Sequence, residues 1–142
     1  MPESALPVEY LFTMKAQTAP GTVIPGGPQG ERITVPVPSG SFEGPRIKGT
    51  LVPNSGGDWV TRRPDGSFQL DVRVTLLTDD GAAIYMSYKG MGVVKEGALA
   101  LRTAPLFETG DERYAWLNRV QAVGWGSAGQ GWVEYDVYAL QV

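Results

Sequence analysis

The chain has 142 residues, with 12 lysines and arginines against 15 aspartates and glutamates, a formal net charge of −3, and neither histidine nor cysteine. Without these two residue types, Ser-His-Asp and Cys-His catalysis are excluded, and so are structural zinc sites. The acidic balance argues against nucleic acid or a membrane surface as partner, and no apolar run approaches the ~20 residues of a transmembrane helix. We therefore expect one cytoplasmic domain over residues 1–142 that needs no metal or cofactor.

Apolar and polar residues alternate with a period of two along most of the chain, as in half-buried strands. In chain order, the predicted strands are 8–14, 33–37, 46–52, 59–63, 68–76, 82–89, 99–103, 115–125 and 131–140. A loop rich in glycine and proline follows the first strand at 25–30, Pro36 marks an edge or a bulge, and only 109–114 has the pattern of a helical turn. About nine strands without a crossover helix predict an all-β fold, a closed antiparallel β-barrel of the lipocalin-like or cyclase-like kind.

The predicted strand 115–125 is apolar on both faces, with Trp116 and Val120 on one face and Leu117 and Trp125 on the other. A monomeric barrel needs only one apolar face. The pattern predicts a ligand-lined lumen inside and a homodimer or higher homo-oligomer outside. The alternative is a thick core with singly exposed aromatic residues.

Two short motifs resemble cofactor sites without the structure those sites require. Residues 124–129 match the dinucleotide fingerprint G-x-G-x-x-G, but they run into a strand where the fingerprint needs a helix. Tyr85 and Lys89 have the spacing of a dehydrogenase pair, yet four residues on a strand span ~13 Å. We interpret both motifs as coincidences and expect no nucleotide cofactor.

Several ordered blocks carry a family resemblance: Gly40-Ser-Phe-Glu-Gly-Pro-Arg-Ile-Lys-Gly49, Gly56-Gly-Asp-Trp59, Leu70-Asp-Val-Arg73, 78–85, 102–110 and 114–118. In this order they resemble the bacterial and fungal family of small β-barrels filed as domain of unknown function 3237, over about residues 5–141. The segment 93–101 is shorter than is usual in that family, which bears on access to the barrel. The resemblance implies an oligomeric antiparallel barrel and no assigned reaction. Some similar small barrels act in secondary metabolism as cofactor-free cyclases, isomerases or lyases.

Asp58 is the first candidate for a catalytic residue, because it follows Gly56 and Gly57 and precedes Trp59. The glycines permit backbone conformations that aim the carboxyl group inward at the barrel rim. Against the indole of Trp59, the carboxyl is desolvated, which raises its pKa toward that of a general acid or base. The alternative is a carboxylate that holds an Asx-turn.

Asp71 and Arg73 share one face of the strand 68–76, ~7 Å apart. This face is either a solvated outer surface or a polar lumen in which Arg73 anchors a substrate oxygen. Tyr85 and Tyr88 lie on opposite faces of the next strand, so only one of them can enter a lumen. Tyr85 shares its face with polar residues and is the predicted oxyanion donor.

Four residues of the late blocks complete the candidate site: Arg102, Glu108, Trp116 and Asn118. They could contact a substrate, or they could fasten the loop 109–114 to the barrel. For Glu108 and Asn118 the structural role is favoured.

The leading hypothesis is a cofactor-independent lyase, isomerase or cyclase that acts on a small, partly apolar, oxygenated molecule in the lumen. In it, Asp58 moves a proton, Arg73 and Tyr85 stabilise an oxyanion, and Trp59 and Trp116 shape the pocket. A second hypothesis is a lipocalin-like barrel that binds a small molecule without changing it. A third is a glycosidase, which needs two carboxyl groups ~5–10 Å apart across a cleft.

Overall fold

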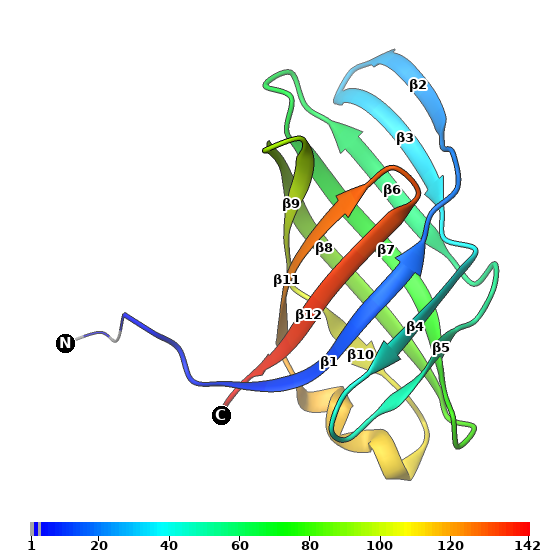
Figure 1. The fold of residues 1–142 in the computed structure, drawn as a ribbon, viewed down its shortest axis with the longest axis vertical. Coiled ribbons are helices and arrows are strands. Elements are labelled where there is room, and N and C mark those ends of the chain that lie inside the picture. The colour runs from blue at the N-terminus through cyan, green and yellow to red at the C-terminus, as the bar shows by residue number, and fades with distance from the viewer. Residues whose placement is uncertain (1, 3) are drawn as a thin grey trace.

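The computed structural model describes residue 2 and residues 4–142, and in that part of the chain twelve strands form one antiparallel sheet (Figure 1). The strands are β1 (Val8–Gln17), β2 (Thr22–Gly27), β3 (Gly30–Pro36), β4 (Ser39–Glu43), β5 (Lys48–Leu51), β6 (Gly57–Arg62), β7 (Phe68–Thr78), β8 (Ala83–Lys95), β9 (Ala98–Thr103), β10 (Leu106–Glu108), β11 (Ala122–Gly129) and β12 (Trp132–Leu140). A 3-10 helix, η1 (Glu112–Arg119), lies between β10 and β11.

Eight of these strands pair in a ring, in the order β8, β9, β11, β12, β1, β4, β5 and β7, and β7 pairs with β8 to complete it. The prediction of an all-β, barrel-like fold is therefore confirmed. The remaining strands extend the sheet, because β5 and β6 share one edge of β7: Leu51 pairs with Leu76, and Asp58 pairs with Val72. β3 then pairs with β6, and β2 pairs with β3, so that these strands project beyond the ring.

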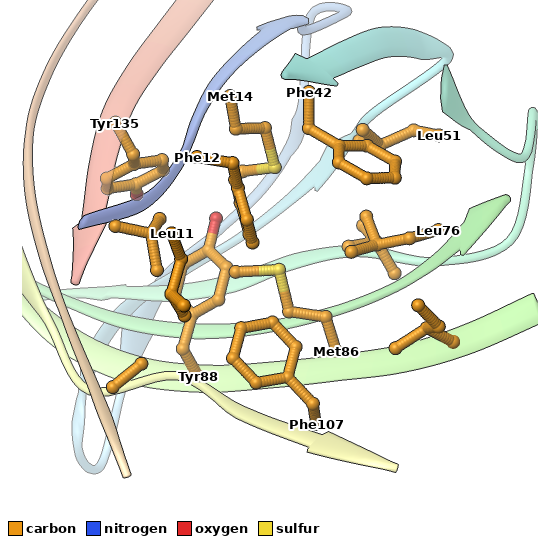
Figure 2. Packing of buried hydrophobic residues seen from close by; sticks show 14 of the residues in the cluster. Leu11, Phe12, Met14, Phe42, Leu51, Leu76, Met86, Tyr88, Phe107 and Tyr135 are labelled. Atoms are coloured by element: carbon orange, nitrogen blue, oxygen red, sulfur yellow. The ribbon is translucent and has the colours of Figure 1, made fainter. Parts of the chain in front are cut away.

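The core occupies the inside of the ring. The alternation predicted for β7 is confirmed, since Leu70, Val72, Val74 and Leu76 are all buried. Large side chains pack together in the interior of the ring (Figure 2). The Phe12 ring meets those of Phe42 and Phe107 edge to face, at centroid distances of 5.5 and 6.0 Å. These aromatic contacts fill part of the barrel interior.

The predicted strand 115–125 is wrong in its first half, which forms η1. Asp111 caps this helix by accepting a 3.0 Å hydrogen bond from the backbone N–H of Arg113. Tyr114 and Leu117, three residues apart, are both buried, as a helix of three residues per turn requires. The predicted turn at 109–114 therefore starts too early, and β11 begins only at Ala122.

Three short strands, β2, β4 and β10, were not predicted. β2 lies in the segment that glycine and proline marked as a loop, and it forms a hairpin with β3 at the outer edge of the sheet. Proline is tolerated at an edge because the missing N–H has no partner strand to bond. Pro36 ends β3, which agrees with its predicted place at an edge or a bulge.

The outer face of the ring carries a hollow lined in part by Val8, Met91, Val123, Trp125 and Tyr138. Trp125 is 63% exposed there. Large exposed apolar areas mark interaction surfaces, so we expect a homodimer or higher oligomer. Trp116, expected to belong to the same two-sided strand as Trp125, lies on η1 instead. Light scattering should give at least twice the chain mass of 15.3 kDa. A mass of one chain at all dilutions would refute this prediction.

In the described part of the chain, no helical segment has the length and apolar character needed to cross a bilayer. The cytoplasmic location stays a prediction.

Candidate functional site

A cavity of about 190 Å³ lies inside the barrel. Two of the elements that line it, β3 and the β11–β12 hairpin, lie at the end of the molecule away from η1 (Figure 1). Its walls come from β3, β6, β7, β8, β9 and the β11–β12 hairpin. The lining is mostly apolar: Thr18, Ile33, Val35, Val37, Asp58, Val60, Phe68, Leu70, Val72, Tyr88, Leu99, Leu101, Ala128, Gly129, Trp132, Val133 and Tyr135. Among these described residues, Asp58 is the one acidic side chain, and there is no basic one.

Close backbone approaches place Asp58 at this wall. A Cβ atom on Gly56 would overlap the carbonyl oxygen of Arg73, and one on Gly57 would come within 2.8 Å of the carbonyl oxygen of Val35. The glycines thus let β6 approach its neighbours closely. The expectation that they adopt conformations closed to other residues is wrong, since the positive φ in this turn belongs to Asn54, at 59°.

The surroundings of Asp58 favour its neutral form. Its cross-strand neighbours are Val35 on β3 and Val72 on β7, and Val72 in turn pairs with Tyr88 on β8. Burial raises the pKa of Asp58 from 3.8 to about 6, although a 3.1 Å hydrogen bond from the backbone N–H of Asp71 lowers it and the Asp71 carboxylate adds a small rise. Asp58 therefore exists in both protonation states near neutral pH.

The indole of Trp59 is not the cause of this desolvation, as the sequence had suggested. Trp59 follows Asp58 on the strand and points to the outer face, where it is 41% exposed. The Arg73 guanidinium lies 5.4 Å from the centroid of its ring. The apolar walls of the cavity therefore desolvate Asp58.

Two tyrosines supply further polar atoms of the cavity: Tyr88, the alternative to Tyr85 on β8, and Tyr135, which was not predicted. Tyr88 and Tyr135 meet edge to face, with ring centroids 5.4 Å apart, and both are buried (Figure 2). Burial raises the pKa of each above its ordinary value. Both rings are neutral at physiological pH and can donate hydrogen bonds. The sequence pattern that could have identified Tyr88 is its alternation in phase with Ile84 and Met86, which are buried.

Arg73 and Tyr85 lie outside the cavity. The Arg73 guanidinium and the Asp71 carboxylate are 3.8 Å apart on the solvated outer face, which was the first of the two alternatives for this pair. Tyr85 is 37% exposed on the outer face of β8, opposite to Tyr88. The structure therefore separates both residues from Asp58 by the thickness of the sheet, and the role predicted for them in oxyanion stabilisation is not available in this cavity.

Arg102 is also on the outside, where its guanidinium lies 3.4 Å from the centroid of the Trp125 ring. Its Nη1 donates a 2.8 Å hydrogen bond to the carbonyl oxygen of Leu101. Arg102 contributes to the outer hollow and not to the lumen.

Trp116 and Asn118 lie on η1 and Glu108 lies on β10, and none of the three lines the cavity. The Asn118 side chain accepts a hydrogen bond from the Thr109 N–H at 2.8 Å and donates one to the Thr109 carbonyl at 3.0 Å, which is the structural role favoured for it. Trp116 packs under the Arg46 guanidinium, 3.7 Å from its ring centroid. Glu108 is exposed on β10.

The two coincidental motifs lie on strands, as expected. Residues 124–129 belong to β11, whose hairpin turns at Gly131 with a φ of 83°, and Tyr85 and Lys89 both lie on β8. Within the described residues, no three acidic side chains gather as a metal site would require.

The sequence is similar to a known family and to several known proteins. A family model described as "Protein of unknown function (DUF3237)" matches residues 6–140. A UPF0311 protein of Rhodopseudomonas palustris is 29% identical over 149 residues, covering 95% of this chain and 97% of its own. A protein of Penicillium herquei named hydroalkoxylation enzyme phnH is 30% identical over 120 residues, covering 84% of this chain and 72% of its own.

Solved structures agree in fold. A β-barrel-like protein from Acinetobacter baumannii superposes with a TM-score of 0.89 at 29% identity, covering 99% of both chains. A structure of an enzyme from Penicillium herquei superposes with a TM-score of 0.75 at 24% identity over 99% of this chain and 98% of that chain, which shows a shared fold.

Proposed function

Because the chain belongs to the DUF3237 family of proteins of unknown function and one relative is named a hydroalkoxylation enzyme, we propose that it is a cofactor-independent enzyme that moves a proton within a small oxygenated molecule, as lyases, isomerases and cyclases do. The observation that carries the proposal is Asp58. It is the one acidic side chain among the described residues of an apolar cavity, and its pKa is raised to about 6. Such a group accepts and returns a proton near neutral pH.

The relative's name suggests the form of the reaction, in which a hydroxyl group adds across a carbon–carbon double bond. The Asp58 carboxylate takes the hydroxyl proton while the oxygen forms its bond to one alkene carbon. The electron pair of the double bond then takes a proton from the Asp58 carboxyl group at the other carbon. Atoms and charge balance, and no oxidant or metal is needed. The buried hydroxyls of Tyr88 and Tyr135 support the proposal as neutral donors to the substrate oxygen.

A lipocalin-like binding protein is the second candidate, favoured by the cavity itself, which is small and mainly apolar. The two candidates differ in the effect expected when the ionisable group of Asp58 is removed, because a binding protein does not need that group. The glycosidase hypothesis loses its basis, since the described residues that line the cavity offer a single carboxyl group where two are required.

The test is to incubate the protein with a metabolite extract and to follow compounds by mass spectrometry. An intramolecular cyclase or isomerase converts one compound into another of equal mass, and a lyase removes or adds a small neutral molecule. Wild-type protein and Asp71→Asn should produce such a change, while Asp58→Asn should not. A compound that is retained but unchanged by wild-type protein would identify the binding protein instead.

We expect activity to survive treatment with EDTA followed by exhaustive dialysis. The chain holds no histidine or cysteine to bind a transition metal and no phosphate-binding loop for a nucleotide. Turnover before and after treatment is the measurement. Loss of activity that returns on addition of zinc, iron or NAD would overturn the cofactor-free proposal.

A further inference from the structure

The size of the cavity limits the ligand. An apolar cavity of about 150 Å³ accommodates benzene, while pockets for drug-sized ligands measure about 300–1,000 Å³. The cavity here, at about 190 Å³, therefore matches one substituted six-membered ring. Trp132 lines it next to Gly129, where a Cβ atom would lie 2.5 Å from the indole nitrogen of Trp132, so the indole packs directly on the backbone of this glycine.

The charge of the cavity limits the ligand as well. Asp58 supplies negative charge, and the described lining contains no lysine or arginine to balance it. The nearby cations are held on the outer face, Arg73 over Trp59 and Arg102 over Trp125. A carboxylate brought into the cavity would lose its hydration and meet a like charge without a counter-ion.

Of the five polar side chains that line the cavity, Asp58, Tyr88 and Tyr135 form one group, and Thr18 and Trp132 are the others. Asp58, Val72 and Tyr88 are successive neighbours across β6, β7 and β8, and Tyr135 reaches Tyr88 from β12. The other walls are almost entirely apolar. A ligand that fits has one oxygen-bearing edge, which meets the carboxyl group and the phenol hydroxyls, and an apolar remainder.

We propose that the cavity binds uncharged molecules of about one substituted ring that carry a hydroxyl or carbonyl oxygen, and that it rejects carboxylates of the same size. This inference rests on the proposed function in that it assigns the substrate class of the same site.

A dependence of binding on pH follows from the groups that face Asp58. β3 presents Val35, β7 presents Val72 and the Asp71 N–H, and β8 and β12 present the two tyrosines, which stay protonated. The Asp71 carboxylate lies on the outer face beside Arg73. Asp58 is thus the group that titrates within the cavity between pH 5 and 8. A ligand that only accepts hydrogen bonds should bind its protonated form better.

Three probes with the same number of non-hydrogen atoms test the proposal: 1-phenylethanol, acetophenone and benzoate. Binding is measured by NMR titration of the Trp132 indole signal at pH 5 and pH 7.5. At pH 7.5 we expect benzoate to bind at least tenfold more weakly than the alcohol, a difference of about 1.4 kcal/mol. Acetophenone should bind more weakly as the pH rises, and the alcohol should not. In Asp58→Asn the pH dependence should vanish and the rejection of benzoate should lessen, whereas Asp71→Asn should behave as wild type.

Benzoate binding to wild-type protein as tightly as the alcohol would overturn the inference, and so would failure of all three probes to bind. These results are separate from the proposed function. Selective binding without turnover of any metabolite leaves the ligand class intact and removes the enzyme. Asp58-dependent turnover of a carboxylate substrate would support the enzyme and contradict the proposed ligand class.

Discussion

Asp58→Asn should lower the rate of the proposed reaction by about 10²- to 10⁴-fold, the usual loss when a general acid or base is removed. Asparagine keeps the shape of the side chain and an oxygen that can accept the hydrogen bond from Asp71, but it cannot carry the proton. In the wild type, kcat/KM should rise with pH and level off above about 6, because the carboxylate is the form that starts the reaction. Steady-state kinetics from pH 5 to 8 is the measurement.

Asp71→Asn is the matched control, because Asp71 lies in the same region but directs its side chain to the outer face beside Arg73. It should retain the wild-type rate, with a pH profile displaced at most slightly toward lower pH, because the Asp71 carboxylate contributes least to the raised pKa of Asp58. Arg73→Met and Tyr85→Phe should also be close to wild type, since both side chains lie outside the cavity. An Asp58→Asn variant with full activity and an unchanged pH profile would contradict the assignment of proton transfer to Asp58.

The same substitution should make the protein more stable above pH 6. The pKa of Asp58 is 3.8 without burial and about 6 in the folded protein, so the folded state holds a proton that the unfolded chain releases between these values. Stability therefore falls as pH rises through this window, and above it the charged group costs about 3 kcal/mol. Asp58→Asn removes this cost, so it should be more stable than wild type by up to about 3 kcal/mol at pH 7 and nearly equal to it at pH 4.

Urea denaturation at pH 4 and pH 7, at one protein concentration, measures the difference. Asp71→Asn again serves as the control and should show little change between the two pH values. A difference between Asp58→Asn and wild type that is the same at both pH values would mean that Asp58 is not desolvated. A stability cost located at a single buried carboxyl group is typical of sites selected for activity.

Much of the architecture follows from local pattern. The alternation of Phe68 to Leu76 identifies β7 and its buried face, because side chains on a strand point alternately to opposite sides. The spacing of the strands and the lack of a long helix indicated the all-β class. The exception was η1, whose apolar run from Tyr114 to Leu117 also fits a strand that is apolar on both faces. Its helical form depends on the Asp111 cap and on burial of Tyr114 and Leu117 against the end of the barrel.

The candidate site, like the fold, could be predicted from the sequence only in part. Its carboxyl group could be found in the sequence, since two glycines beside Asp58 mark a close approach of strands. The tyrosines that share the cavity with Asp58 could not be identified from the sequence. Parity shows that Tyr85 and Tyr88 lie on opposite faces, but which face is inside depends on how the ring closes. The face of β8 that carries Tyr85 and polar residues is exposed to solvent, and the apolar face that carries Tyr88 points into the lumen.

Composition and period thus establish an all-β chain without histidine or cysteine chemistry, because these are properties of residue types and their order. The inward direction of Tyr88 and Tyr135, the outward direction of Arg73, and the raised pKa of Asp58 depend on closure of the ring. Closure of the ring brings together strands that are far apart in the chain. The Asp58 carboxyl group is desolvated only when those strands enclose a common volume. No local segment contains that information.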